Sequence, residues 1–334
     1  MKIKKKHMYA GLFIVSLLAA ALGGYYFSKN KKNESAKNKA KPDFSADKVD
    51  NILWLVDKDG YLVYPLNRGD IKFRRDNYSQ TENLTVSKVI YESRRGNIYG
   101  LLVLPKYAQD LMPGVVLLPG AGVSKESELK LAEKIASLGA AVLTIDQRGV
   151  GETGGSFPTL EEDYAGFLEA KEPYQHLMVY DALRAYDLLY SAPFVDPDRI
   201  IIAGESLGGR IAIIAAAIDR NVKGVLVISS AGFDFKGGPD PKKNAFLKSI
   251  DSDNYIGLIA PRKIVMMHNS YDKNILLKSA ANSFLKAQEP KQFVLVNDTS
   301  CNHGYCDSMY GGMADALDYL ISIRSRTLVS VPAK

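Results

Sequence analysis

The feature that most constrains this chain is an apolar strand that runs almost directly into a helix. Ile200–Ala203 has the composition of a buried strand, because three of its four apolar residues are β-branched. Gly204-Glu205-Ser206-Leu207-Gly208 follows, and good helix formers continue from there without a gap. So sharp a turn needs small residues where strand and helix meet, and it leaves Ser206 exposed beside the free N–H groups of a helix N-terminus. The stretch predicts an α/β fold with Ser206 as a candidate nucleophile.

Strand and helix patterns alternate along the rest of the chain. We expect buried strands at 115–118, 140–145, 222–228, 263–267 and 292–296, and helices near 125–138, 174–190, 275–287 and 308–323. Such alternation indicates βαβ units, hence a mainly parallel sheet with helices on both faces. The segment 231–260 shows no clear pattern and is too short for a large cap domain.

Two further strand patterns precede the alternating region. Leu84–Tyr91 and Asn97–Leu104 are separated by Arg94-Arg95-Gly96-Asn97, which suits a hairpin turn. We expect this antiparallel hairpin to form the first edge of the sheet. The predicted fold class is therefore α/β, with a mostly parallel twisted sheet, an antiparallel N-terminal edge and helices on both faces.

The net charge of +6 is concentrated at the N-terminus. Residues 1–41 carry +9 and the remainder −3, so the folded body offers no electrostatic basis for nucleic-acid binding. Lysines precede an uncharged run from Met8 to Phe27, about the length that crosses a bilayer core. The run is interpreted as an uncleaved anchor or, alternatively, as a signal peptide cleaved near Ala19-Ala20-Ala21. We expect a membrane-anchored protein with its catalytic domain outside the cytoplasm, or a secreted protein if cleavage occurs.

These patterns divide the chain into four parts. Residues 1–28 are predicted to be the membrane anchor or signal segment, and 29–50 a disordered basic linker. Residues 51–326 form the predicted catalytic domain, and 327–334 a C-terminal tail.

The two cysteines of the chain, Cys301 and Cys306, lie five residues apart. A disulfide that closes this short loop is plausible in an oxidising compartment, which agrees with export. Two free thiols are the alternative. The spacing lacks the second Cys/His pair of a zinc site, so no metal is expected.

Glycine and serine also cluster in ordinary turns between strands and helices, so an active Ser206 needs a base. The chain has four histidines. His7 precedes the apolar run and His176 falls within a predicted helix, whereas His303 lies in the loop after the last strand. A base in that loop follows the chain order Ser…Asp…His. His303 is the candidate base, and His268, at the end of the 263–267 strand, is the alternative.

The base needs an acid that orients it. Asp272 follows the 263–267 strand, just before a predicted helix, and is the candidate. It could instead serve only to cap that helix. Asp234, after the preceding strand, and Asp298, close to His303, are the competitors.

Acyl transfer also needs preorganised donors for the oxyanion. The backbone N–H of Leu207, directly after the candidate nucleophile, is one candidate. The second is the N–H of Ala121, because Gly120-Ala121-Gly122 lets the backbone approach a substrate. A glycine loop that serves only as a turn is the alternative. Asp146 and Arg148 are expected to brace a loop beside the site.

Together these segments resemble the α/β-hydrolase superfamily, from about Leu84 to Ile323. The strand pair before the oxyanion loop looks like the branch that contains dienelactone hydrolases, acetyl xylan esterases and prolyl-oligopeptidase-type catalytic domains. The resemblance implies a Ser-His-Asp hydrolase without a cofactor. Two departures are Pro119, where many lipases and esterases have His, and Asn269, where a His-Gly pair is common at the strand end.

The leading functional hypothesis is a serine hydrolase that cleaves a carboxylic ester through an acyl-enzyme. A propeller domain of the prolyl-oligopeptidase type would not fit in the roughly 80 residues before the core, which favours an esterase. An amidase or small serine peptidase with the same triad is one alternative. A non-catalytic binding protein on a hydrolase fold is the other. The expected partner is a small-molecule ester or amide substrate.

Overall fold

The computed structural model describes residues 53–107 and 110–323 of the chain. These residues belong to one compact unit, Phe44–Lys334. The predicted anchor at 1–28, the linker at 29–50, the tail at 327–334 and His7 lie outside the described residues. Within the described part, no helix combines the length and apolar content that spanning a bilayer requires.

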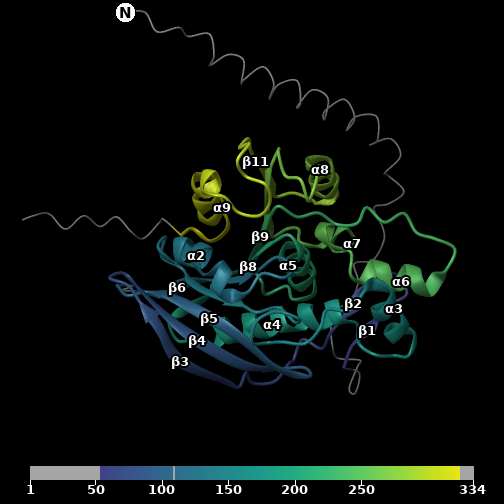
Figure 1. Ribbon diagram of the computed structural model, residues 1–334, viewed down its shortest axis with the longest axis horizontal. Coiled ribbons are helices and arrows are strands. Elements are labelled where there is room, and N and C mark those ends of the chain that lie inside the picture. The colour runs from purple at the N-terminus through teal and green to yellow at the C-terminus, as the bar shows by residue number, and fades with distance from the viewer. Residues whose placement is uncertain (1–52, 108–109, 324–334) are drawn as a thin grey trace, which may run out of the picture. The chain divides into compact units, whose positions relative to one another are not determined.

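A nine-stranded sheet in the order β11-β10-β9-β8-β6-β7-β5-β4-β3 organises the described residues (Figure 1). Its strands are β3 (Phe73–Gln80), β4 (Leu84–Ser93), β5 (Gly96–Pro105), β6 (Met112–Leu118), β7 (Ala141–Ile145), β8 (Val195–Glu205), β9 (Gly224–Ile228), β10 (Lys263–Asn269) and β11 (Lys291–Val296). The pairs from β7 to β11 are parallel, and the pairs from β3 to β7 are antiparallel. The predicted α/β fold class is confirmed.

The antiparallel end of the sheet is larger than predicted. β4 and β5 form the expected hairpin, with Ser93 opposite Gly96. However, β3 pairs with β4 and forms the outer edge, so the prediction that the hairpin is the edge was wrong. All eight residues of β3 are exposed. A strand without a buried face lacks the alternation of polar and apolar residues that reveals strands in a sequence.

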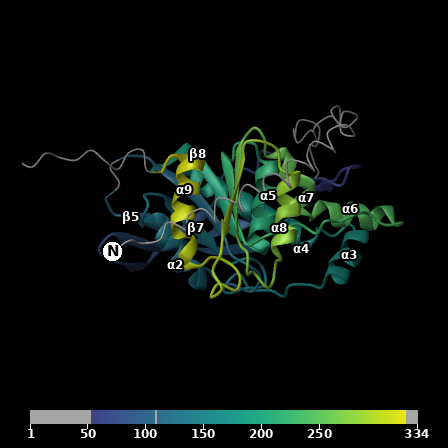
Figure 2. The same cartoon turned by 90° about the horizontal axis from the view of Figure 1, so that it is seen from above.

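Helices cover both faces of the sheet (Figure 2). They are α2 (Lys125–Ala136), α3 (Leu160–Leu168), α4 (Tyr174–Ser191), α5 (Leu207–Ile218), α6 (Pro241–Ser249), α7 (Ser252–Tyr255), α8 (Leu277–Lys286) and α9 (Tyr310–Ile321). Apolar residues of α2 and α9 pack in one core with one face of the sheet. Those of α4, α5 and α8 pack in a second core on the other face. Because both faces are covered, β6, β7 and β9 are buried along their whole length.

The segment without a clear pattern, 231–260, contains α6 and α7. Each begins with an aspartate N-cap, Asp240 or Asp251, whose side chain accepts hydrogen bonds from the first turn. α3 was also missed, although Thr159 and Glu162 form a capping box at its start. A small two-stranded sheet, β1 (Leu55–Val56) with β2 (Leu62–Val63), precedes β3.

Candidate active site

Ser206 lies at the turn between β8 and α5 in a conformation that few non-glycine residues adopt. Its φ is 49° and its ψ is −115°, and such strain persists only where the surroundings enforce it. A Cβ on Gly204 would lie 2.4 Å from the Gly208 backbone, and one on Gly208 would lie 2.1 Å from the Leu118 carbonyl oxygen. The predicted sharp turn is therefore present, and both glycines are required for it.

Hydrogen bonds hold this turn from the side of β9. The Ser206 N–H donates to the Ile228 carbonyl at 3.0 Å, and the Ser230 hydroxyl donates to the Ser206 carbonyl at 2.6 Å. Leu207 is the first residue of α5. The first N–H groups of a helix have no intrahelical partner, so the Leu207 amide remains suited to an oxyanion.

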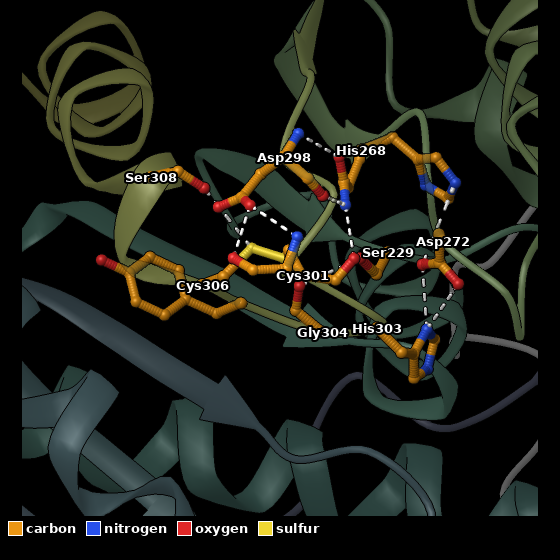
Figure 3. The surroundings of a disulfide bond; sticks show 12 residues. Ser229, His268, Asp272, Asp298, Cys301, His303, Gly304, Cys306 and Ser308 are labelled. Atoms are coloured by element: carbon orange, nitrogen blue, oxygen red, sulfur yellow. Dashed lines mark hydrogen bonds and ion pairs between the residues drawn. A yellow bond between two sulfur atoms is a disulfide. The ribbon is translucent and has the colours of Figure 1, made fainter.

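His303 and Asp272 come together in the loops that follow β11 and β10 (Figure 3). His303 Nδ1 lies 2.9 Å and 3.0 Å from the two Asp272 carboxylate oxygens. The Asp272 side chain is 0% exposed, and its Oδ1 also accepts the N–H groups of Asn274 and Ile275. These backbone bonds show that Asp272 both organises its own turn and contacts the imidazole. Its contact with Nδ1 leaves Nε2 as the nitrogen that can exchange a proton with a nucleophile.

Ser206, Asp272 and His303 follow three parallel strands at the carboxyl edge of the sheet. Within residues 53–107 and 110–323, no hydrogen bond joins Ser206 Oγ to His303 Nε2. The two segments are nevertheless linked, because the Tyr305 N–H donates to Glu205 Oε1 at 2.7 Å. Catalytic hydrogen bonds in enzymes without substrate are often long and shorten only in the complex.

The alternative acids and base lie in other surroundings. Asp234 pairs with Lys236 and Lys286, and Asp298 accepts hydrogen bonds from Ser300. His268 Nε2 lies 2.8 Å from the Ile275 carbonyl oxygen, and burial lowers the pKa of His268. These contacts favour His303 and Asp272 over the alternatives.

The loop that carries His303 is held by several contacts (Figure 3). Cys301 and Cys306 form a disulfide across it. Asn269 donates to the carbonyl oxygens of Asp298 and Cys301, and Ser229 Oγ donates to the Gly304 carbonyl at 3.1 Å. Asn269, a departure from the family pattern in the sequence, thus fixes the start of this loop.

The glycine loop after β6 lies against the candidate nucleophile. A Cβ on Gly120 would be 3.6 Å from Ser206 Cβ. Gln147 Nε2 donates to the Pro119 carbonyl oxygen, which fixes the loop from the side of β7. Ala121 is exposed in this loop.

Asp146 and Arg148 fix the neighbouring loop. Asp146 accepts hydrogen bonds from the backbone N–H of Lys125 and of Glu152 and from Lys125 Nζ. Arg148 forms two hydrogen bonds with the buried Asp181. Both side chains are engaged in structural contacts, as predicted. Among the described residues, no group of three or more His, Cys, Asp or Glu could hold a metal ion.

The sheet order, the serine at the strand–helix turn and the His–Asp pair at the same edge define an α/β hydrolase. Solved structures agree on the fold: an acetyl xylan esterase from Paenibacillus sp. R4 superposes with a TM-score of 0.64 at 21% identity, over 76% of this chain and 90% of that one. Acetyl Xylan Esterase 1 from Thermoanaerobacterium sp. JW/SL YS485 gives a TM-score of 0.63 at 18% identity, over 77% and 89%.

The chain belongs to the acetyl xylan esterase (AXE1) family, whose model matches residues 67–236. The matched region includes Ser206 and ends before Asp272 and His303. Among curated relatives, the putative hydrolase YtaP of Bacillus subtilis (strain 168) is 36% identical over 92 residues, 28% of this chain and 30% of its own length. Acetyl esterase Axe7A of Xylanibacter ruminicola is 30% identical over 167 residues, 47% of this chain and 38% of its own.

Family membership places the chain among carboxylesterase-like hydrolases. The chain spans between 30% and 50% of the length of the curated relatives it matches.

Proposed function

We propose that this protein hydrolyses carboxylic esters with Ser206 as nucleophile, His303 as general base and Asp272 as the orienting acid. The observation that carries the proposal is the contact of His303 Nδ1 with buried Asp272 at 2.9 Å, at the edge of the sheet where β8 delivers Ser206. Family membership supports the ester as substrate class.

The proposed reaction proceeds in two halves. Ser206 Oγ attacks the acyl carbon while His303 Nε2 accepts its proton, and the N–H groups of Leu207 and Ala121 bind the oxyanion. His303 then donates the proton to the leaving alcohol, which leaves an acyl-enzyme on Ser206. Water attacks this ester with His303 again as base, and the carboxylic acid leaves. Asp272 stabilises the imidazolium that forms in each half.

The names of the similar proteins suggest a short acyl group as the first substrate to test, since they include acetyl xylan esterases and an acetyl esterase. Nitrophenyl acetate and longer nitrophenyl esters would be assayed on the wild-type protein and on Ser206→Ala. We expect Ser206→Ala to lose at least about a thousandfold in kcat. Ser137→Ala, at the C-terminal end of α2, is the matched control and should keep wild-type activity. Equal rates from wild type and Ser206→Ala would disprove the mechanism.

Two outcomes would favour the alternative hypotheses over an ester hydrolase. Cleavage of aminoacyl anilides without cleavage of esters would identify an amidase or peptidase. Failure of folded protein to react with a fluorophosphonate at Ser206 would identify a non-catalytic protein on this fold.

We further propose that the catalytic domain works outside the cytoplasm, tethered to a membrane by its N-terminal segment. The apolar run Met8–Phe27 between lysine-rich flanks and the Cys301–Cys306 disulfide support this location. Protease treatment of intact cells, followed by measurement of the mature N-terminus by mass spectrometry, tests it. A protected, cytoplasmic domain would contradict the proposal, and cleavage near Ala19-Ala20-Ala21 would indicate a secreted protein.

A further inference from the structure

A cationic side chain lies on the first turn of α5, close to the candidate nucleophile. Arg210 follows Ser206 by one helical turn, a rise of about 6 Å, and its backbone N–H donates to the Ser206 carbonyl at 3.3 Å. Side chains of a helix point back toward its N-terminus, so the Arg210 guanidinium extends toward the end of α5 that carries Ser206. Arg210 has no role in the proposed reaction, yet it is partly buried.

The guanidinium stacks on an aromatic ring of the loop that follows β9. Its Cζ lies 4.6 Å from the centre of the Phe233 ring, and Phe233 is 42% exposed. The same loop contacts both parts of the candidate site, since Ser230 Oγ donates to the Ser206 carbonyl and Ser229 Oγ donates to the loop of the proposed base. The Arg210–Phe233 pair therefore lies at the carboxyl edge of the sheet, as the candidate site does.

Within the described part of the chain, no hydrogen bond or ion pair engages the Arg210 guanidinium. Asp251 is the nearby carboxylate, but its Oδ1 accepts the backbone N–H groups of Phe233 and Asp253. Asp253 in turn forms an ion pair with Lys286. Burial lowers the pKa of Arg210, and the charge of Asp251 raises it. Because a guanidinium stays protonated at neutral pH, Arg210 is a partly desolvated cation that no described acid neutralises by contact.

The chemistry of the side chain indicates which ligand it can take. A guanidinium presents its N–H donors in a planar fork, which matches a carboxylate through two parallel hydrogen bonds. Charges removed from water are ordinarily paired, and Arg210 has no such partner among the described residues. A carboxylate on a bound substrate would supply that partner, while the Phe233 ring holds the guanidinium in place through a cation–π contact.

We propose that Arg210 binds a carboxylate carried by the substrate and makes this enzyme selective for acidic esters. The inference rests on the proposed function, because it names the class of ester that the same site takes. It makes Arg210 a residue that determines specificity, whereas the bond-breaking steps remain with Ser206, His303 and Asp272.

The kinetic test uses two pairs of esters that differ in charge and little in shape. Monoethyl succinate and ethyl succinamate carry a carboxylate or an amide on the acyl side, and 4-acetoxybenzoate and 4-acetoxybenzamide carry it on the leaving-group side. Acid release is titrated at constant pH with the full-length wild type and variants. In at least one pair, the wild type should give the higher kcat/KM for the carboxylate, and that pair shows which half of the ester is recognised.

The variants of Arg210 are compared by the ratio of kcat/KM for the carboxylate to that for the amide. Arg210→Met keeps a long side chain against Phe233 without the cation, so the ratio should fall about tenfold to a hundredfold. Arg210→Lys keeps the charge without the fork and should give an intermediate ratio. Arg220→Met removes an exposed arginine just beyond the other end of α5 and should keep the wild-type ratio.

A binding measurement tests the same contact without turnover. Calorimetric titration with each carboxylate ester should show at least about tenfold tighter binding of the preferred one to Ser206→Ala than to Ser206→Ala with Arg210→Met. If the variant with Met does not fold, the ratio of Arg210→Lys to wild type decides.

Equal carboxylate-to-amide ratios in the wild type and the Arg210 variants would overturn the proposal, as would a wild type that prefers the amide in both pairs. Arg210 would then serve only to pack against Phe233. Absence of ester hydrolysis and of fluorophosphonate labelling at Ser206 would instead refute the proposed function, while the calorimetric comparison would still decide whether Arg210 binds a carboxylate.

Discussion

At the turn around Ser206, the space left by neighbouring backbone decides which residue each position can hold. Gly208 belongs to a helix, where alanine is ordinarily the better residue by about 1 kcal/mol. At this position, however, a methyl group would collide with the carbonyl oxygen of Leu118, 2.1 Å away. The collision involves backbone on both sides, so no side chain can move to relieve it.

Gly208→Ala is therefore expected to destabilise the protein by more than about 3 kcal/mol or to prevent folding. Gly311→Ala is the matched control, because Gly311 also lies in a helix, α9, but a Cβ there meets nothing within 4 Å. That substitution should stabilise the protein by about 0.5 to 1 kcal/mol. Urea denaturation of both variants measures the difference. Similar effects from the two substitutions would show that the turn tolerates a side chain at Gly208.

The Asp272 carboxylate should contribute to kcat both through its negative charge and through its capacity to accept a hydrogen bond from the imidazole. Asp272→Asn keeps the shape but offers an N–H to the imidazole, which favours the wrong tautomer of His303. By analogy with other serine hydrolases, kcat should fall on the order of 10³- to 10⁴-fold, with KM changed far less. Asp298→Asn, whose side chain contacts Ser300 in the same region, should retain kcat within about threefold. A comparable loss in both variants would assign the orienting role to neither.

At the scale of secondary-structure elements, the sequence predicted those helices and strands whose apolar residues recur at a regular spacing. The strands β6 to β11 and the helices α2, α4, α5, α8 and α9 were predicted because their apolar residues form continuous or amphipathic runs. β3 escaped because it is exposed along its whole length, and α6 because only Phe246 and Ser249 of it are buried. Their formation depends on tertiary pairing and on capping residues such as Asp240, which carry little weight in a periodicity analysis.

The candidate site was predictable to a similar extent. Ser206, Asp272 and His303 each follow a strand pattern, so chain order alone could nominate them. Glu128 could not be nominated, since α2 contains three glutamates in its 12 residues and nothing local distinguishes the buried one.

Removal of the disulfide in the His303 loop should lower activity while the protein remains folded. Cys301→Ser with Cys306→Ser opens a short loop, for which the loss of chain constraint corresponds to about 2 kcal/mol. The fold should survive, because Asn269 and Ser229 still hold the loop. We expect kcat to fall several-fold as His303 gains freedom. Dithiothreitol should reproduce this fall in the wild type and have no effect on the double variant. Unchanged kcat after complete reduction would show that the hydrogen bonds alone position the base.

For the whole molecule, pH should act on folding through buried ionisable groups. His176 lies in the first turn of α4 and is fully buried, with its Nε2 2.7 Å from Ser249 Oγ. Ser249 Oγ donates to the Phe246 carbonyl, so His176 Nε2 carries the proton and Nδ1 is the buried, unpartnered acceptor among the described atoms. Burial lowers the pKa of His176 from 6.5 to about 3.

The sign of the effect follows from proton binding in each state. Between pH 6.5 and about 3, His176 is protonated in the unfolded chain and neutral in the folded one. The unfolded state then binds more protons, so the free energy of unfolding decreases as the pH falls through this window, by up to a few kcal/mol. Glu128 acts at the other end: its pKa, raised from 4.5 to about 8, makes the folded state bind the extra proton, so stability decreases as the pH rises through that window.

Urea unfolding from pH 4.5 to 9 should therefore distinguish the two groups. His176→Gln is expected to be less stable than the wild type at pH 7, because it disturbs the contact with Ser249, yet to lose less stability on acidification. Glu128→Gln should match the wild type near pH 5 and exceed it increasingly toward pH 9. Curves that run parallel to the wild type across the whole range would exclude both residues as determinants of the pH dependence. A crossing of the His176→Gln and wild-type curves at acidic pH would show directly that the cost of keeping a neutral histidine in the core exceeds the value of its hydrogen bond there.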